Sequence, residues 1–203
     1  GSVMMQLKVL GCSGGIGGSN HTTAFLIDQS VLIDAGTGVS TLTFAELVKI
    51  DHVFLTHAHF DHVWDNEKAQ KEFNIPIFTP KDDIFLLSND IFGIGVPTSQ
   101  ADVVVEPDST VLVGGVEATF LHYPGHTPGC SAIVIDEAMF SGDFIFRGSI
   151  GRVDFPYSEP EDMKKSLEKF IRLKQELKIY PGHGGATDTK TEKISAARWL
   201  EML

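Results

Sequence analysis

The feature that most constrains this chain is the segment His57–His62, which reads His-Ala-His-Phe-Asp-His and holds three imidazoles and one carboxylate. It follows directly on the apolar, β-forming run at residues 53–56, a pattern typical of a buried strand. The cluster is therefore expected on the loop that leaves a strand, where a rigid sheet can hold side chains in place. Imidazole nitrogen and carboxylate oxygen are donors that suit zinc, iron or manganese. Without a metal, so many titratable groups crowded together would be costly to desolvate.

Three later segments carry further donors in similar surroundings. His126 lies in a loop rich in glycine and proline, Asp143 ends an apolar strand, and His183 follows another short strand. Each is flanked by glycine, which lets the backbone pass close to a shared site. The sequence therefore predicts a metal site assembled from four separate segments.

Taken in order, the His-x-His-x-Asp-His segment, Pro-Gly-His-Thr, Ser-Gly-Asp and Pro-Gly-His-Gly resemble the metallo-β-lactamase superfamily over nearly the whole chain. The resemblance implies an α/β fold, a four-layer αββα sandwich, with two divalent metal ions at one edge of its sheets. Zinc is the expected metal, with iron and manganese as alternatives. Carried over by position, the resemblance implies these ligands: His57, His59 and His126 for the first metal, Asp61, His62 and His183 for the second, and Asp143 as the bridge.

Composition favours one domain and argues against two classes of partner. With 203 residues and 42% apolar content, the chain is long enough for one well-buried domain and short for two. That domain is expected to span residues 3–203, with Gly1-Ser2 as a remnant of tag removal. The net charge of −11 argues against a nucleic-acid surface, and no apolar run approaches the ~18 residues that cross a membrane. The expected partner is a small-molecule substrate and the expected location is the cytoplasm, while the oligomeric state stays open.

Hydrophobic periodicity predicts an order of elements that fits two sheets covered by helices. Strands are expected at residues 6–10, 23–27, 31–34, 53–56, 75–79, 103–105, 110–113, 116–122, 131–135 and 138–140. Helices are expected at residues 41–49, 64–73, 159–177 and 191–202, with a helical turn or two at 81–87. Ser158 is the expected N-cap of the helix at 159–177, with Pro160 in its first turn. Ile91–Pro97 is expected to form an apolar lip over the site.

Two cations about 3.5–4 Å apart can bind a water between them and lower its pKa towards ~7. The expected reaction is attack of this metal-bridging hydroxide on a thioester or ester, with Asp143 bridging the metals and Asp61 orienting or deprotonating the water. Phe146–Pro156 resembles the substrate-side loop of the glyoxalase II branch, and the chain is similar to its compact single-domain group. That resemblance implies that Arg152 contacts an anionic part of the substrate, which its guanidinium fork suits. An ion pair between Arg152 and Asp154 is an equal alternative.

Two other functions stay open at this stage. The N-terminal third, with Leu10–Gly15 and Leu32–Gly38, is similar to class II cyclic-nucleotide phosphodiesterases, so a small phosphodiester is an alternative substrate. An iron-dependent persulfide dioxygenase is a second alternative. For that class the resemblance implies a single iron held by His57, His126 and Asp143.

Overall fold

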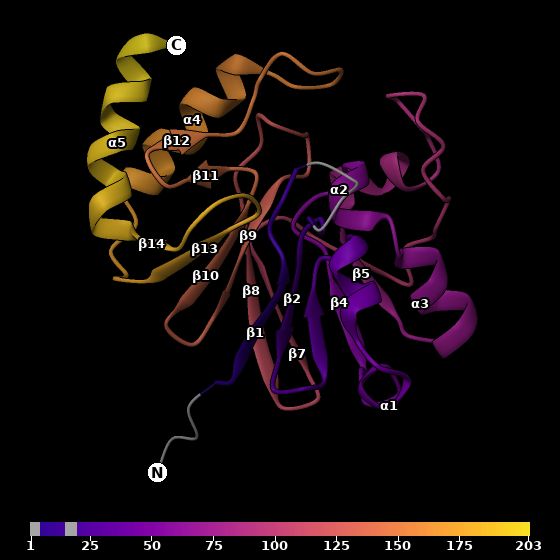
Figure 1. The fold of residues 1–203 in the computed structure, drawn as a ribbon. Coiled ribbons are helices and arrows are strands. Elements are labelled where there is room, and N and C mark those ends of the chain that lie inside the picture. The colour runs from indigo at the N-terminus through magenta and orange to yellow at the C-terminus, as the bar shows by residue number, and fades with distance from the viewer. Residues whose placement is uncertain (1–4, 15–19) are drawn as a thin grey trace.

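The structure is a computed structural model that describes residues 5–14 and 20–203. Two six-stranded sheets face each other, with α1, α2 and α3 on the outer side of one sheet and α4 and α5 on the outer side of the other (Figure 1). The expected four-layer αββα sandwich is therefore confirmed. The proposed tag remnant, Gly1-Ser2, lies outside the described residues.

The first sheet has the order β1-β2-β3-β4-β5-β6, antiparallel from β1 to β3 and parallel from β3 to β6. Its strands are β1 Leu7–Gly11, β2 Ala24–Ile27, β3 Val31–Ile33, β4 His52–Phe54, β5 Ile77–Pro80 and β6 Val103–Val105. The second sheet has the order β14-β13-β10-β9-β8-β7 and is antiparallel except between β10 and β13. Its strands are β7 Ser109–Val113, β8 Val116–His122, β9 Ser131–Ile135, β10 Ala138–Gly142, β13 Lys178–Pro181 and β14 Thr187–Asp188.

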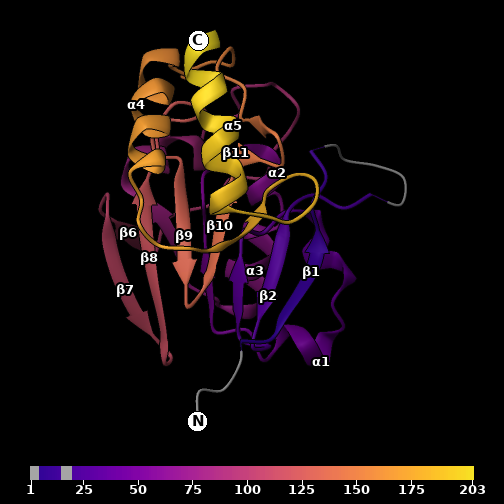
Figure 2. The ribbon, with the colours of Figure 1, turned by 90° about the vertical axis from the view of Figure 1, so that its left-hand side faces the viewer.

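A short antiparallel hairpin, five α-helices and the 3-10 helices Thr37–Thr41 and Lys81–Leu87 complete the described fold. The hairpin pairs β11 Ile145–Phe146 with β12 Ser149–Ile150. The helices are α1 Phe44–Leu47, α2 Phe60–Val63, α3 Asn66–Phe73, α4 Pro160–Ile171 and α5 Thr189–Met202. Figure 2 shows α4 and α5 lying over the second sheet. Within residues 5–14 and 20–203, every helix is too short or too polar to cross a membrane.

Three apolar layers hold the sandwich together, because successive side chains of a strand point to opposite faces of its sheet. In β2, Phe25 packs between the two sheets while Leu26 packs toward α1, α2 and α3. In β9, Ile133 packs between the sheets while Ala132 packs toward α4 and α5. Burial on both faces explains why these strands are apolar throughout instead of alternating with polar residues.

The helix expected at residues 159–177 is shorter than predicted, because α4 ends at Ile171. The chain must then reverse so that β13 can start at Lys178, parallel to β10. Apolar spacing alone does not distinguish such a connection from a further helical turn.

The start of α4 also differs from the expectation in one residue. Pro160 lies in the first turn as predicted, but the N-cap is Glu159, whose side chain accepts from the N–H of Glu161. The hydroxyl of Ser158 instead donates to the carbonyl of His126 at 2.7 Å. The residue predicted as a helix cap therefore fixes a loop that carries a candidate metal ligand.

The helix expected at residues 41–49 is shorter than predicted, because α1 spans only Phe44–Leu47 and a separate 3-10 turn at Thr37–Thr41 precedes it. Thr43 divides them. Its hydroxyl accepts from the N–H of Glu46 at 3.2 Å, and the Glu46 carboxylate accepts from the N–H of Thr43 at 3.1 Å. This capping box starts a new helix. The strands expected at residues 103–105, 116–122 and 131–135 and the helical turns expected at 81–87 have the predicted bounds. The other expected elements are present with shifted ends, and α2, β11, β12 and β14 are additional.

Candidate metal centre

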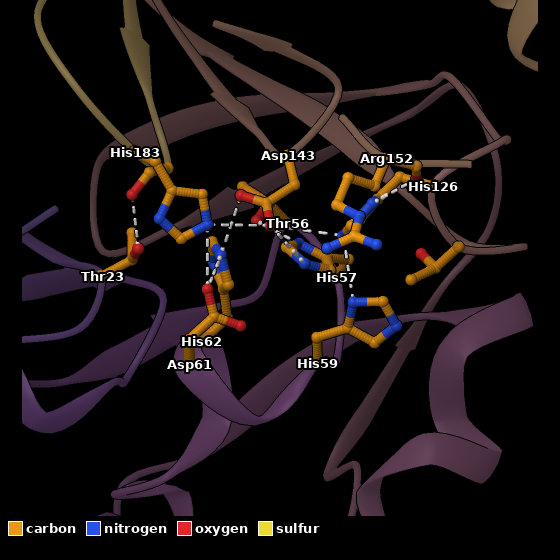
Figure 3. A network of polar contacts seen from close by, with 12 residues as sticks. Thr23, Thr56, His57, His59, Asp61, His62, His126, Asp143, Arg152 and His183 are labelled. Atoms are coloured by element: carbon orange, nitrogen blue, oxygen red, sulfur yellow. Dashed lines mark hydrogen bonds and ion pairs between the residues drawn. The ribbon is translucent and has the colours of Figure 1, made fainter. Parts of the chain in front are cut away.

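Four loops carry the predicted donors to one end of the sandwich, where their side chains point toward one another (Figure 3). The donors of the segment His57–His62 lie after β4 and on α2, His126 lies between β8 and β9, Asp143 follows β10, and His183 follows β13. The loops after parallel strands meet because such strands end at the same edge of a sheet. All the donor residues are buried except His183, whose side chain is 24% exposed.

His57, His59 and His126 form what we call the first donor set. His59 Nδ1 lies 3.0 Å from His126 Nε2, and one ring nitrogen of each residue lies within 4.8 Å of the other two. His57 Nε2 is buried and has no hydrogen-bond partner among the described residues. Since a neutral imidazole has one donor and one acceptor, converging nitrogens of this kind fit a cation better than a closed hydrogen-bond network.

Asp61, His62 and His183 form the second donor set. Asp61 Oδ2 lies 3.2 Å from His62 Nε2 and 3.0 Å from His183 Nε2. Neighbouring donors around a tetrahedral ion with bonds of about 2.0–2.1 Å lie roughly 3.3 Å apart. The two distances from Asp61 are compatible with such an ion. The donors within 4.8 Å of one another at this position are those of His57, Asp61, His62 and Asp143, and His183 contacts this group through Asp61 and Asp143.

Asp143 lies between the two sets. Its Oδ1 is 3.1 Å from His62 Nε2, and its Oδ2 is 3.0 Å from His183 Nε2. Oδ2 is also 3.2 Å from His126 Nε2 and 3.5 Å from His57 Nε2. One carboxylate thus contacts donors of both sets, which is the geometry of a bridging ligand. The structure brings all the predicted ligand residues into one cluster.

When no cation is present, protons on His62 and His183 balance the negative charge of the buried carboxylates of Asp61 and Asp143. Burial alone would lower the pKa of His62, but the charges of Asp61 and Asp143 raise it well above its usual range. Burial also opposes protonation of His183, yet its hydrogen bond to Asp143 raises the pKa to about 9. Burial would raise the pKa of Asp61 and of Asp143, but the charge on His62 holds both below their usual range. A bound cation can replace these protons.

His57 and His59 of the first set carry no such protons. Burial is the largest cause that lowers the pKa of His57 and His59, and the neighbouring imidazoles add to it. Neutral imidazole is the form that binds a metal. The buried His57 Nε2, which makes no hydrogen bond within the described residues, and the buried carboxylates of Asp61 and Asp143 fit a pair of divalent cations.

Asp34, which was not predicted as a site residue, orients one ligand from behind. Its carboxylate accepts from His62 Nδ1 at 2.7 Å and from the N–H and hydroxyl of Thr56 at 2.8 and 2.7 Å. With Nδ1 engaged, Nε2 of His62 faces the centre. The available signal was a carboxylate at the end of a buried strand, since Asp34 follows β3 directly.

Asp83 is a second buried carboxylate that sequence reasoning missed. It accepts from the N–H of Ala58 at 3.0 Å, the hydroxyl of Thr127 at 2.7 Å and the N–H of Gly129 at 2.7 Å. Ala58 lies between two ligands of the first set, and Thr127 directly follows the third. A Cβ at Gly129 would lie 2.7 Å from the backbone nitrogen of Asp83, so this position requires glycine. Asp83 therefore ties together the two loops of the first set. Burial raises its pKa, although the three donors oppose this.

Arg152 lies beside the centre with its side chain paired to an acid. Its Nε and Nη2 donate to Asp154 at 2.9 and 2.7 Å, and its guanidinium carbon lies 4.4 Å from the centre of the Phe155 ring. The side chain remains 64% exposed. The carbonyl of Arg152 accepts from His126 Nδ1 at 2.8 Å, which leaves Nε2 of His126 facing the centre. In this structure the ion pair with Asp154 is formed, and the backbone of Arg152 orients a ligand.

The segment expected to form an apolar lip, Ile91–Pro97, does lie against the first donor set. The Phe92 ring contacts His59 with 5.3 Å between ring centroids and Phe60 with 5.8 Å. The carboxylate of Asp90 accepts from the N–H groups of Ile94 and Gly95, which closes the lip into a compact loop.

Known proteins are similar to this chain in sequence and in structure. The family model described as the metallo-beta-lactamase superfamily matches residues 17–183. An uncharacterized protein of Aquifex aeolicus is 31% identical over 175 residues, which cover 81% of this chain and 83% of that protein. The probable metallo-hydrolase YqgX of Bacillus subtilis is 32% identical over 151 residues, covering 70% of this chain and 72% of that protein.

Two solved structures are similar over almost the whole chain. The B3 metallo-beta-lactamase BLEG-1 has a TM-score of 0.79 at 24% identity, with 92% of this chain and 96% of that chain covered. TTHA1623 in a di-iron-bound form has a TM-score of 0.72 at 29% identity, with 93% and 98% covered.

Proposed function

This chain belongs to the metallo-β-lactamase superfamily, and from that premise we propose that it is a glyoxalase II-like hydrolase with two divalent metal ions. Its proposed substrate is a thioester or ester of a small anionic molecule. The single observation that carries the proposal is the position of Asp143, whose two oxygens lie 3.0–3.2 Å from His62, His126 and His183. A carboxylate shared by two donor sets is what a dinuclear site requires.

The residues around the centre have separable roles in this proposal. Two divalent ions, when bound, supply a water of lowered pKa and polarise the substrate carbonyl. Asp143 holds the two donor sets together. Asp61, which its low pKa keeps ionised at neutral pH, orients a water between the sets. Asp34 and the carbonyl of Arg152 fix the rings of His62 and His126 so that each Nε2 faces inward.

The guanidinium of Arg152 is the proposed contact for the anionic part of the substrate. It is exposed and contacts Asp154 and the ring of Phe155, and a substrate carboxylate can take the place of Asp154 as its partner. Zinc is the proposed metal, and the di-iron form of the similar TTHA1623 supports iron as the alternative. The acidic composition favours a small-molecule substrate over nucleic acid, and the cytoplasm is the proposed location.

Metal analysis combined with substrate screening tests the proposal. We expect about two metal ions per chain in protein purified without added metal or chelator, together with cleavage of anionic thioesters. About one iron per chain, with oxygen uptake on addition of a persulfide, would instead indicate the dioxygenase. Cleavage of cyclic nucleotides without thioester cleavage would indicate the phosphodiesterase.

A further inference from the structure

Three phenylalanine rings from separate segments meet beside the first donor set, and we call them the aromatic wall. Phe60 lies on α2, Phe92 lies on the lip, and Phe155 lies between β12 and α4. Phe92 contacts Phe155 with 5.2 Å between ring centroids and Phe60 with 5.8 Å, at interplanar angles of 82°. Edge-to-face contacts of this kind stabilise aromatic pairs beyond simple burial. The three rings therefore form one continuous apolar surface.

The aromatic wall adjoins the metal donors directly. Phe92 and Phe155 lie 5.3 and 5.8 Å from the ring of His59, and Phe155 lies 5.9 Å from that of His126. All three phenylalanines are only half-buried, although they surround buried histidines. Large rings left partly open beside a reactive centre are available to a bound molecule.

The opposite side of the centre is built differently. Next to His183 the chain runs through glycines: a Cβ on Gly14 would lie 3.0 Å from the His183 ring, and Gly184 has a φ of 83°. Arg147 lies near this loop, with Nη1 3.7 Å from the position of a Cβ on Gly185. Phe146 also lies on this side, with 5.4 Å between its ring centroid and that of His183. The side of His59 thus offers three phenylalanine rings, and the side of His183 offers one ring, backbone and a cation.

We propose that the aromatic wall is the subsite for the acyl group of the substrate, and that this acyl group is uncharged and bulky, either aromatic or medium-length aliphatic. The inference rests on the proposed hydrolase function and names the class of its substrate. The acyl chain packs against the rings, and the guanidinium of Arg152, which lies over Phe155 at 4.4 Å from the ring centre, remains the proposed contact for the anionic thiol part. The three rings lie on the side of His59, so the acyl chain goes there.

A series of thioesters with one common thiol tests this assignment on the zinc-loaded protein. The thiol is 3-mercaptopropionate, which is anionic, and the acyl groups are acetyl, hexanoyl and phenylacetyl. We expect kcat/KM for phenylacetyl to exceed that for acetyl by at least about tenfold, mostly through KM. Phe92→Ala and Phe155→Ala should each reduce this ratio to about threefold or less, with zinc content unchanged. Only the ratio is compared between variants, because Phe155 also contacts the guanidinium of Arg152. Phe44→Ala, which removes a 73% exposed ring on α1, should leave the ratio as it is.

Direct binding of the carboxylate products separates this inference from the proposed function. Phenylacetate should bind the zinc-loaded protein about tenfold more tightly than acetate in calorimetry, and Phe92→Ala should remove the difference. Tighter binding of phenylacetate without any thioester cleavage would support the acyl subsite and refute the proposed hydrolase function. Equal cleavage of all the thioesters would keep the hydrolase and refute the subsite. A loss of zinc, or an equal loss of turnover on every thioester, in both wall variants would also refute it, because the rings would then only support the histidines.

Discussion

Replacement of Asp83 by alanine tests how the fold holds the first donor set. The change removes an acceptor from two buried N–H groups, those of Ala58 and Gly129, and from the hydroxyl of Thr127. Each buried donor left without a partner costs about 1–3 kcal/mol, while removal of a buried carboxylate relieves part of its desolvation cost. We therefore expect a net loss of about 3–4 kcal/mol in the free energy of unfolding. At roughly 2–4 °C per kcal/mol for a domain of this size, Tm should fall by about 6–16 °C.

Two measurements on the same variant check this reasoning. Denaturant unfolding of the metal-free protein gives the loss of stability, and competition with a chromophoric chelator gives the zinc affinity. The affinity should fall because the loops that carry His57, His59 and His126 are no longer tied to each other. Asp82→Ala is the matched control, since Asp82 is the adjacent residue and its side chain is 46% exposed. Stability within about 1 kcal/mol of the wild type, together with unchanged zinc affinity, would refute the assigned role of Asp83.

Four further outcomes follow from the geometry of the site. His59→Ala should lose hydrolysis and about one metal ion per chain while the chain stays folded. His52→Ala, whose imidazole lies outside the donor sets, should keep hydrolysis and the full metal content. Full activity of His59→Ala would contradict the two-metal mechanism. Zinc binding at pH 8 should release at least about one proton per chain, measured by calorimetry in buffers of different ionisation enthalpy, because the pKa of His183 is raised from 6.5 to about 9. The same raised pKa means that the metal-free protein loses this stabilising contribution as pH rises from 6.5 to about 9. Arg152→Ala should raise KM about tenfold for an anionic thioester and leave KM for a neutral one unchanged; equal effects on both would remove Arg152 from substrate recognition.

The layered fold was predictable because its physical cause is local. Runs such as Ala24–Ile27 and residues 132–135 are apolar on both faces, and that property can be read without knowing their neighbours. The donor residues were identified for the same reason, since the spacing within His57–His62 is itself a chemical pattern. The sequence could therefore indicate both the sandwich and the ligands.

The supporting carboxylates were not predictable in this way. Asp34 and Asp83 are ordinary acidic residues in the sequence, and their roles depend on contacts with residues 22 to 46 positions away. The end of α4 at Ile171 was missed for a related reason, because the position of β13 decides it. Side-chain pairing at Arg152 was one of two alternatives until the structure placed Asp154 against it.

Each donor set takes ligands from both halves of the sandwich. In the first set, His57 and His59 follow a strand of the first sheet and His126 follows a strand of the second. In the second set, Asp61 and His62 follow a strand of the first sheet and His183 follows a strand of the second. A bound ion in either position would therefore crosslink the two sheets. Since neither half can complete a set alone, metal uptake depends on the docking of the sheets, and the bound metal in turn opposes their separation.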